Sequence, residues 1–191
     1  MGTRVSILTA VAITLLMGPS AAAQSRGPVP NTGMMAAGVS MGAAPAFDSA
    51  LNNGLDLAGQ FESYLTPRVS IRALVSKAWN DINDRPFTGT VAPIAVNGNV
   101  VYNWEGGAWH PYATAGVGLY HYTFTEGGLD SSDTKFGVNA GGGVEYFVTR
   151  HDTLTGEVVF HAIPGTVSSL RSSYDAGYWR IAGGYKKYFG R

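Results

Sequence analysis

A histidine and a nearby group of serines are the residues of this chain whose types could support nucleophilic catalysis. His161 precedes four serines, Ser168, Ser169, Ser172 and Ser173. An imidazole base within hydrogen-bond reach of a hydroxyl activates that hydroxyl as a nucleophile. Nothing in the sequence completes the geometry of a catalytic triad. We therefore predict that the protein is not an enzyme and that His161 is a hydrogen-bonding residue.

The residues that could bind a metal or a cofactor are equally scattered. The chain has no cysteine, and its four histidines lie in separate segments without the close spacing of a zinc site. Two acidic segments, 81–84 and 130–133, lack the repeated oxygen ligands of a calcium loop. The glycines at 141–143 do not precede a helix, as a phosphate-binding loop would require. We predict no metal site and no cofactor.

The remaining charged residues alternate with apolar ones. This is a period of two residues, which is the period of a β-strand. In residues 55–65, for example, Leu55, Leu57 and Phe61 are separated by polar residues such as Asp56 and Gln60. Similar alternation predicts eight strands, and no segment shows a regular helical stripe. The predicted strands lie near residues 34–42, 55–65, 69–76, 94–104, 113–120, 135–146, 154–161 and 179–186.

The amino terminus has the organisation of a secretory signal peptide. Arg4 is followed by an apolar stretch at 5–17, and Ala21-Ala-Ala23 offers a cleavage site. We predict a cleaved signal peptide at 1–23, a flexible leader at 24–32 and one β-barrel domain at 33–189. Because Arg4 is the one charged residue of the signal, cleavage leaves 12 basic and 13 acidic residues, a net charge of −1. This balance excludes a basic nucleic-acid-binding face.

Alternation alone does not say which face of a barrel points inward, since a soluble lipocalin-like barrel also alternates. Charged residues form only 14% of the chain, against about 25% in soluble domains. Short connections at 66–68, 105–110 and 149–152 alternate with longer polar ones at 43–53, 80–90, 126–134 and 162–173, as in outer-membrane barrels. Glycines within the strands suit a tightly curved wall. We therefore predict an all-β, eight-stranded antiparallel up-and-down transmembrane barrel with its apolar face toward lipid.

Aromatic residues gather near the two ends of the predicted strands, as expected of two interfacial girdles. One set comprises Trp104, Trp109, Tyr112, Tyr146, Phe147, Tyr188 and Phe189, and the other comprises Trp79, Phe87, Tyr122, Phe124, Phe136, Phe160, Tyr178 and Trp179.

The opposite face would then place charged residues in the lumen, where buried charges persist only when paired. We predict that Arg72 and Arg180 bridge Glu62, Glu145 and Glu157. The interior of an eight-stranded barrel is just filled by side chains. A polar plug is therefore favoured over a gate that opens when the pairs rearrange. The predicted inward set is Asp56, Glu62, Arg72, Lys135, Glu145, Glu157, Arg180 and Lys186.

Three segments resemble the small outer-membrane β-barrel family that includes OmpA-type and OmpX-type proteins. They are residues 111–119 (PYATAGVGL), 136–146 (FGVNAGGGVEY) and 179–189 (WRIAGGYKKYF), and the resemblance covers 33–189. In the last strand, Gly184 and Phe189 match the family's assembly signal, whereas Lys187 occupies an apolar position of it. Barrels resembling the lipid A deacylases carry a serine two residues after the histidine, where this chain has Ile163.

The resemblance implies a protein exported through the periplasm to the bacterial outer membrane. Its implied partners are membrane lipid and lipopolysaccharide, the outer-membrane insertion machinery and an extracellular partner bound by the loops at 80–85 and 126–133. We expect a structural or interaction role. Passage of small solutes is the alternative, and a lipid A-modifying enzyme is less favoured.

Overall fold

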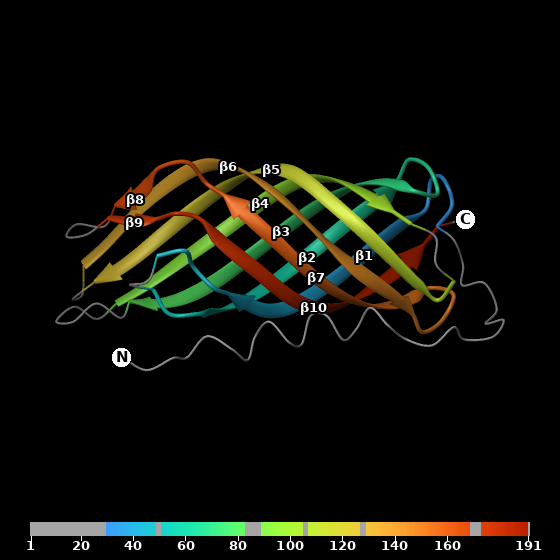
Figure 1. The fold of residues 1–191 in the computed structure, drawn as a ribbon, viewed down its shortest axis with the longest axis horizontal. Helices are drawn as coiled ribbons and strands as arrows, with labels where there is room; N and C mark the ends of the chain where they lie inside the picture. Colours follow the sequence, from blue (N-terminus) through green and yellow to red (C-terminus); the bar gives the residue numbers. More distant parts are fainter. Residues whose placement is uncertain are drawn as a thin grey trace, which may run out of the picture.

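The barrel of this protein is closed and entirely antiparallel, as predicted (Figure 1). The computed structural model describes residues 30–48, 51–82, 89–104, 107–126, 129–168 and 173–190. The predicted signal peptide and most of the predicted leader lie outside these residues. The strands are β1 (Met35–Ala44), β2 (Gly54–Tyr64), β3 (Val69–Ile82), β4 (Gly89–Asn103), β5 (Trp109–Glu126), β6 (Leu129–Phe147), β7 (Asp152–Ala162) and β10 (Tyr178–Phe189), with a small hairpin of β8 (Thr166–Ser168) and β9 (Ser173–Asp175).

The order round the barrel is β1-β10-β7-β6-β5-β4-β3-β2, so each strand lies beside its sequence neighbours and the last barrel strand closes on the first. The described residues contain no helix long and apolar enough to cross a membrane.

The pairing register determines the tilt of the strands relative to the barrel axis. Starting at Met35 and stepping from each residue to its partner on the next strand, one turn round the barrel ends at Trp179 of β10. Trp179 lies opposite Pro45, which is ten residues after Met35. A stagger of ten over eight strands corresponds to a tilt of about 40° from the barrel axis. Side chains that meet in the lumen are therefore mostly not cross-strand partners, but residues offset along neighbouring strands.

The two faces of each strand are oriented as predicted. Leu57, Val75, Val117 and Ile181 are about half exposed on the outer wall, whereas Glu62 and Arg72 are buried in the lumen. On β5 the apolar outer face runs from Trp109 to Leu119, which at a tilt of about 40° spans about 25 Å along the axis. This matches the height of the lipid-facing band of outer-membrane barrels.

The predicted aromatic girdles are only half right. Trp104, Trp109, Phe189, Trp79, Phe136 and Trp179 are exposed on the outer wall at the two ends of this band. Two further members, Tyr146 and Phe160, are half-buried and pack against Trp109 and Trp179. Six other members of the predicted girdles point inward because they share the alternation of the lumenal residues, and Phe87 lies outside the described residues. The six inward aromatics are Tyr112, Tyr122, Phe124, Phe147, Tyr178 and Tyr188.

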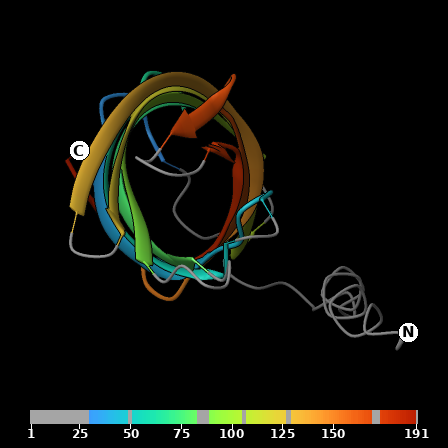
Figure 2. The same cartoon turned by 90° about the vertical axis from the view of Figure 1, so that its left-hand side faces the viewer.

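The inward aromatics and nearby aliphatic residues close the lumen at both ends. At the end with the short turns, Met34, Ala36, Tyr64, Phe147 and Tyr188 form one buried cluster. At the opposite end a larger cluster contains Ile82, Val91, Tyr120, Tyr122, Phe124, Ile163 and Tyr178. β8 reaches over this second end of the ring of strands (Figure 2). The polar part of the lumen is thus confined between two apolar clusters.

Two of the predicted long connections are shorter than expected. β5 continues to Glu126 and β6 begins at Leu129, so most of the predicted loop at 126–134 is strand. Alternation of apolar residues gives no signal here, because residues 130–134 of β6 are polar on both faces. Asn80, also placed in an exterior loop, is buried on β3, and its amide donates to the carbonyls of Ala44 and Asn52 at 2.7 and 2.9 Å.

Candidate functional site

The lumen between the two apolar clusters holds a continuous network of ion pairs. We call the end with the short turns the lower end. The lowest layer of the network centres on Lys186 of β10, whose ammonium donates to Glu62 of β2 at 2.9 Å and to Glu145 of β6. The hydroxyl of Tyr188 also donates to Glu145, and it lies 2.8 Å from the hydroxyl of Tyr64. Lys186 has no exposed side-chain surface. It is held by one carboxylate from each side of β10, because β2 lies two strands away in one direction and β6 two strands away in the other.

The middle layer crosses the barrel. Arg72 of β3 pairs with its cross-strand neighbour Glu62, with Nε 3.4 Å from Oε2. Its Nη1 reaches Glu157 of β7 at 2.5 Å, and the hydroxyl of Tyr112 donates to the same carboxylate oxygen at 2.9 Å. The Arg72 guanidinium also lies over the Tyr112 ring, 5.0 Å from its centroid. This contact extends the network onto β5.

The position of β3 and β7 in the barrel gives the Arg72–Glu157 pair its significance. The strand order places four steps between β3 and β7 in either direction, so they are diametrically opposite. The direct contact between their side chains therefore spans the lumen at that level.

The upper layer contains Arg180 of β10. Its guanidinium donates to Asp56 at 2.6 Å, to the second oxygen of Glu157 at 2.8 Å and to the hydroxyl of Ser40 at 2.5 Å. Glu157 therefore joins Arg72 to Arg180 and links the middle layer to the upper one.

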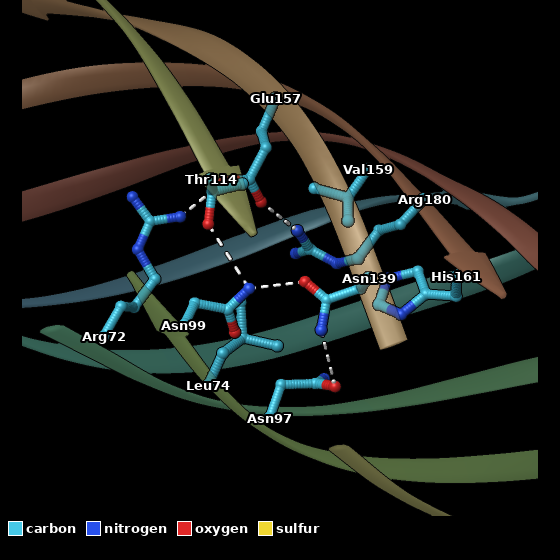
Figure 3. Close-up of a pocket in the computed structure, with 10 residues that line it drawn as sticks. All are labelled: Arg72, Leu74, Asn97, Asn99, Thr114, Asn139, Glu157, Val159, His161 and Arg180. Atoms are coloured by element: carbon cyan, nitrogen blue, oxygen red, sulfur yellow. Dashed lines mark hydrogen bonds and ion pairs between the residues drawn. The ribbon is translucent and has the colours of Figure 1, made fainter. Parts of the chain in front are cut away.

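Beside Arg180, three amides form a further hydrogen-bonded group (Figure 3). Asn99 donates to Asn139, and Asn139 donates to Asn97 at 3.3 Å. Residues of this group and of the ion-pair network line a cavity of about 10 Å³, which is roughly the space that one water molecule needs.

His161 closes the upper layer. Its Nδ1 lies 2.8 Å from the hydroxyl of Tyr120, and its ring is stacked on Tyr178 with centroids 4.5 Å apart. With 2% of its surface exposed, it is a lumenal hydrogen-bonding residue. Of the serines considered with it, Ser169 and Ser172 lie outside the described residues.

The structure places all six residues of the predicted ion-pair network in the lumen, but with different partners in one case. Glu145 is held by Lys186 rather than by either arginine. Asp56 joins through Arg180, whereas Lys135 stays apart and pairs with Asp133 at 3.1 Å near the barrel's end, with its side chain 31% exposed.

The tyrosines and asparagines of the network were not singled out from the sequence. The alternation could have identified them, because on each strand they occupy the same alternate positions as the inward-facing residues. They are Tyr112, Tyr188, Asn97, Asn99 and Asn139.

The charges of the network do not balance. Three buried cations, Arg72, Arg180 and Lys186, face four buried carboxylates, those of Asp56, Glu62, Glu145 and Glu157. Asp56 Oδ2 has no hydrogen-bond partner among the described residues. Within the same residues, no group of three or more His, Asp or Glu side chains could hold a metal ion.

Comparisons with known proteins give a family model and several solved structures. The model of the outer membrane protein β-barrel domain matches residues 8–186. Comparison with curated proteins gives no significant match.

Among the solved structures, Neisserial surface protein A is 17% identical with a TM-score of 0.64, and the match covers 82% of this chain and 99% of that one. OprG from Pseudomonas aeruginosa is 15% identical with a TM-score of 0.64, and covers 86% and 99%. Ail of Yersinia pestis is 10% identical with a TM-score of 0.58, and covers 83% and 99%. A second Ail structure is a complex with the heparin analogue sucrose octasulfate. At these identities the likeness shows a shared fold.

Proposed function

Because this chain belongs to the family of outer membrane protein β-barrel domains, which places it in the bacterial outer membrane, we propose that it is a closed, non-conducting barrel that acts through its exterior end. In such barrels the short turns face the periplasm and the longer connections face the exterior. The end that carries β8, β9 and the long β5–β6 hairpin is then the exterior one, at the left of Figure 1.

The observation that carries this proposal is the contact between opposite walls. Arg72 and Glu157 bridge β3 and β7 at 2.5 Å, with Tyr112 on the same carboxylate. For solute to pass, this pair and the layers above and below it would have to separate together. Each separation would leave buried charges without partners, which is strongly destabilising. The network is therefore better suited to fix the register of the strands than to act as a gate.

The exterior end would supply the interaction role. Beyond the apolar band, the outward side chains of the β5–β6 hairpin are polar, among them Thr125, Asp130, Ser132 and Thr134. Ail, which shares the fold, has been crystallised with a polyanionic sugar. The hairpin of this protein carries exposed Asp130 and the Asp133–Lys135 pair, so its charge favours a cationic partner instead. Lipid and lipopolysaccharide would contact the apolar outer wall, and the insertion machinery would recognise β10.

Passage of small solutes is the second candidate, and the cavities in the lumen count against it. Two cavities lined by residues of the ion-pair network each have a volume of only about 10 Å³. A lipid A-modifying enzyme has less support, because His161 is enclosed between Tyr120 and Tyr178.

Single-channel recording distinguishes the closed barrel from the conducting one. The full-length protein is inserted into planar bilayers, and its folded state is checked by the change in gel migration on boiling. We expect no conductance steps from the natural protein. Steady openings in protein that is folded would overturn the closed-barrel proposal.

A further inference from the structure

The junction between β1 and β10 joins the first and the last strand of the barrel (Figure 1). Its paired residues run from Met35–Phe189 to Ala43–Ile181. At each other junction of the ring, the two neighbouring strands are also joined by the turn or loop that connects them along the chain. We call the β1–β10 junction the seam. Because no turn tethers its two sides, noncovalent contacts alone keep it closed.

On the lumenal face, side chains of β10 cross over β1 to reach β2. The Arg180 guanidinium donates to Asp56 of β2 at 2.6 Å, and the Lys186 ammonium donates to Glu62 of β2 at 2.9 Å. β1 lies between β10 and β2 in the strand order, so both ion pairs span it. The hydroxyl of Ser40 on β1 accepts from the same guanidinium at 2.5 Å. The two neighbours of β1 are thus joined to each other across its inner face.

The inward side chains of β1 are small enough to lie under these ion pairs. They are Ala36, Gly38, Ser40, Gly42 and Ala44. At Gly38, a Cβ would lie 2.7 Å from the Tyr185 carbonyl oxygen and 3.1 Å from the Gln60 amide nitrogen. A larger inward side chain on β1 would therefore displace the side chains that cross it.

On the outer wall, a side chain from the β1 side crosses β10 in the opposite direction. Beyond β1 the chain stays beside β10, where the Trp179 amide donates to the Pro45 carbonyl at 2.9 Å. The Phe47 amide donates to the Gly177 carbonyl at 3.1 Å. The Phe47 ring covers Gly177, since a Cβ there would lie 2.5 Å from two ring carbons. It stacks on Phe160 of β7, the strand beyond β10, with ring centroids 5.2 Å apart.

We propose that these contacts form a two-sided clasp that keeps the seam closed. The clasp consists of the Arg180–Asp56 and Lys186–Glu62 pairs inside and the Phe47–Phe160 stack outside. Each contact joins the β1 side of the seam to the β10 side, so lateral opening of the seam would break all three together with the backbone ladder. Opening would also leave buried charges without partners. The clasp is independent of the exterior interaction role, because it concerns where the wall of the barrel resists opening.

Hydrogen exchange of the full-length protein in phosphatidylcholine nanodiscs tests the clasp. The amides of β1 are compared with those of β5, on the opposite side of the ring. Asp56→Asn weakens the inner face of the clasp and Phe47→Ala the outer face. Each should speed exchange on β1 about tenfold and exchange on β5 less than about twofold. The matched control is Phe136→Ala, which deletes the same side chain from the outer wall of β6 and should not affect β1 selectively. Equal acceleration on both strands, or an equal effect of the control on β1, would overturn the proposal.

A disulfide across the seam separates opening of the seam from local loosening of β1. The natural chain has no cysteine, and Met41 and Gly183 are paired residues on the outer face of the seam. A Cβ at Gly183 would meet only the Thr155 carbonyl oxygen, at 3.7 Å, so Met41→Cys with Gly183→Cys fits the site. With this disulfide formed, Phe47→Ala and Asp56→Asn should leave exchange on β1 at the natural rate, and reduction should restore the acceleration. Fast exchange on β1 in the oxidised variants would show local loosening without opening and would overturn the clasp.

Discussion

Removing Arg72 tests whether the crossing of the lumen stabilises the barrel. Arg72→Met keeps a side chain of similar length but deletes the contacts with Glu62 at 3.4 Å and Glu157 at 2.5 Å. The four carboxylates would then face two cations instead of three. Because breaking a buried pair from one side costs roughly 3–5 kcal/mol, we expect a loss near the lower limit, about 3 kcal/mol. Each carboxylate retains another cation, Lys186 for Glu62 and Arg180 for Glu157.

The partner substitution makes this expectation a double-mutant cycle. Glu157→Gln keeps the shape and an acceptor oxygen but weakens charge-assisted hydrogen bonds, for a loss of about 1.5 kcal/mol. In the Arg72→Met background the same change removes a carboxylate that has lost one of its two cations. The double variant should therefore lose about 3 kcal/mol in all, a coupling of about 1.5 kcal/mol between the two positions.

The assay is equilibrium urea unfolding in lipid vesicles, followed by fluorescence of the four tryptophans. Lys135→Met is the matched control, because its ion pair with Asp133 joins side chains about 30% exposed. A surface pair of this kind is worth less than about 1 kcal/mol. Strictly additive losses at Arg72 and Glu157, or a loss at Arg72 no larger than that at Lys135, would refute the reasoning.

Three further predictions concern the wall and the upper lumen. Val117→Arg on the lipid-facing wall should lower the free energy of unfolding in vesicles by about 2–4 kcal/mol, whereas Thr125→Arg beyond the band should change it little; equal losses would contradict the assigned membrane band. Gly116→Ala should destabilise the barrel by about 1–3 kcal/mol, because its Cβ would lie 2.2 Å from the Gly98 carbonyl oxygen, while Gly98→Ala meets nothing within 4 Å and should be tolerated. Cells expressing the natural protein and His161→Ala should contain identical lipid A by mass spectrometry; a modification that disappears with His161 would contradict the prediction that the protein is not an enzyme.

The sequence was sufficient for the fold because every strand within the membrane must separate lipid from lumen. Leu57 and Glu62 lie on opposite faces for this reason. Once one residue of a strand is known to face the lumen, alternation assigns the other residues of that strand to their faces. The same rule fails beyond the apolar band, where residues 130–134 of β6 are polar on both faces. The sequence therefore predicted a loop around Asp130 and Asp133, although these residues belong to β6 and are paired with β5.

The partners within the lumen were less predictable than its members. Parity alone identifies Glu145 as inward, but which cation reaches it depends on the stagger of ten residues, which no local pattern encodes. With that stagger, Lys186 on β10 reaches across β7 to Glu145, and Arg72 reaches across the whole lumen to Glu157. A change of register would keep every residue on its face and still break these pairs. Under the proposed structural role, the ion-pair network would select one register among those that alternation permits. A barrel without charged lumenal residues would have to achieve the same selection by packing alone.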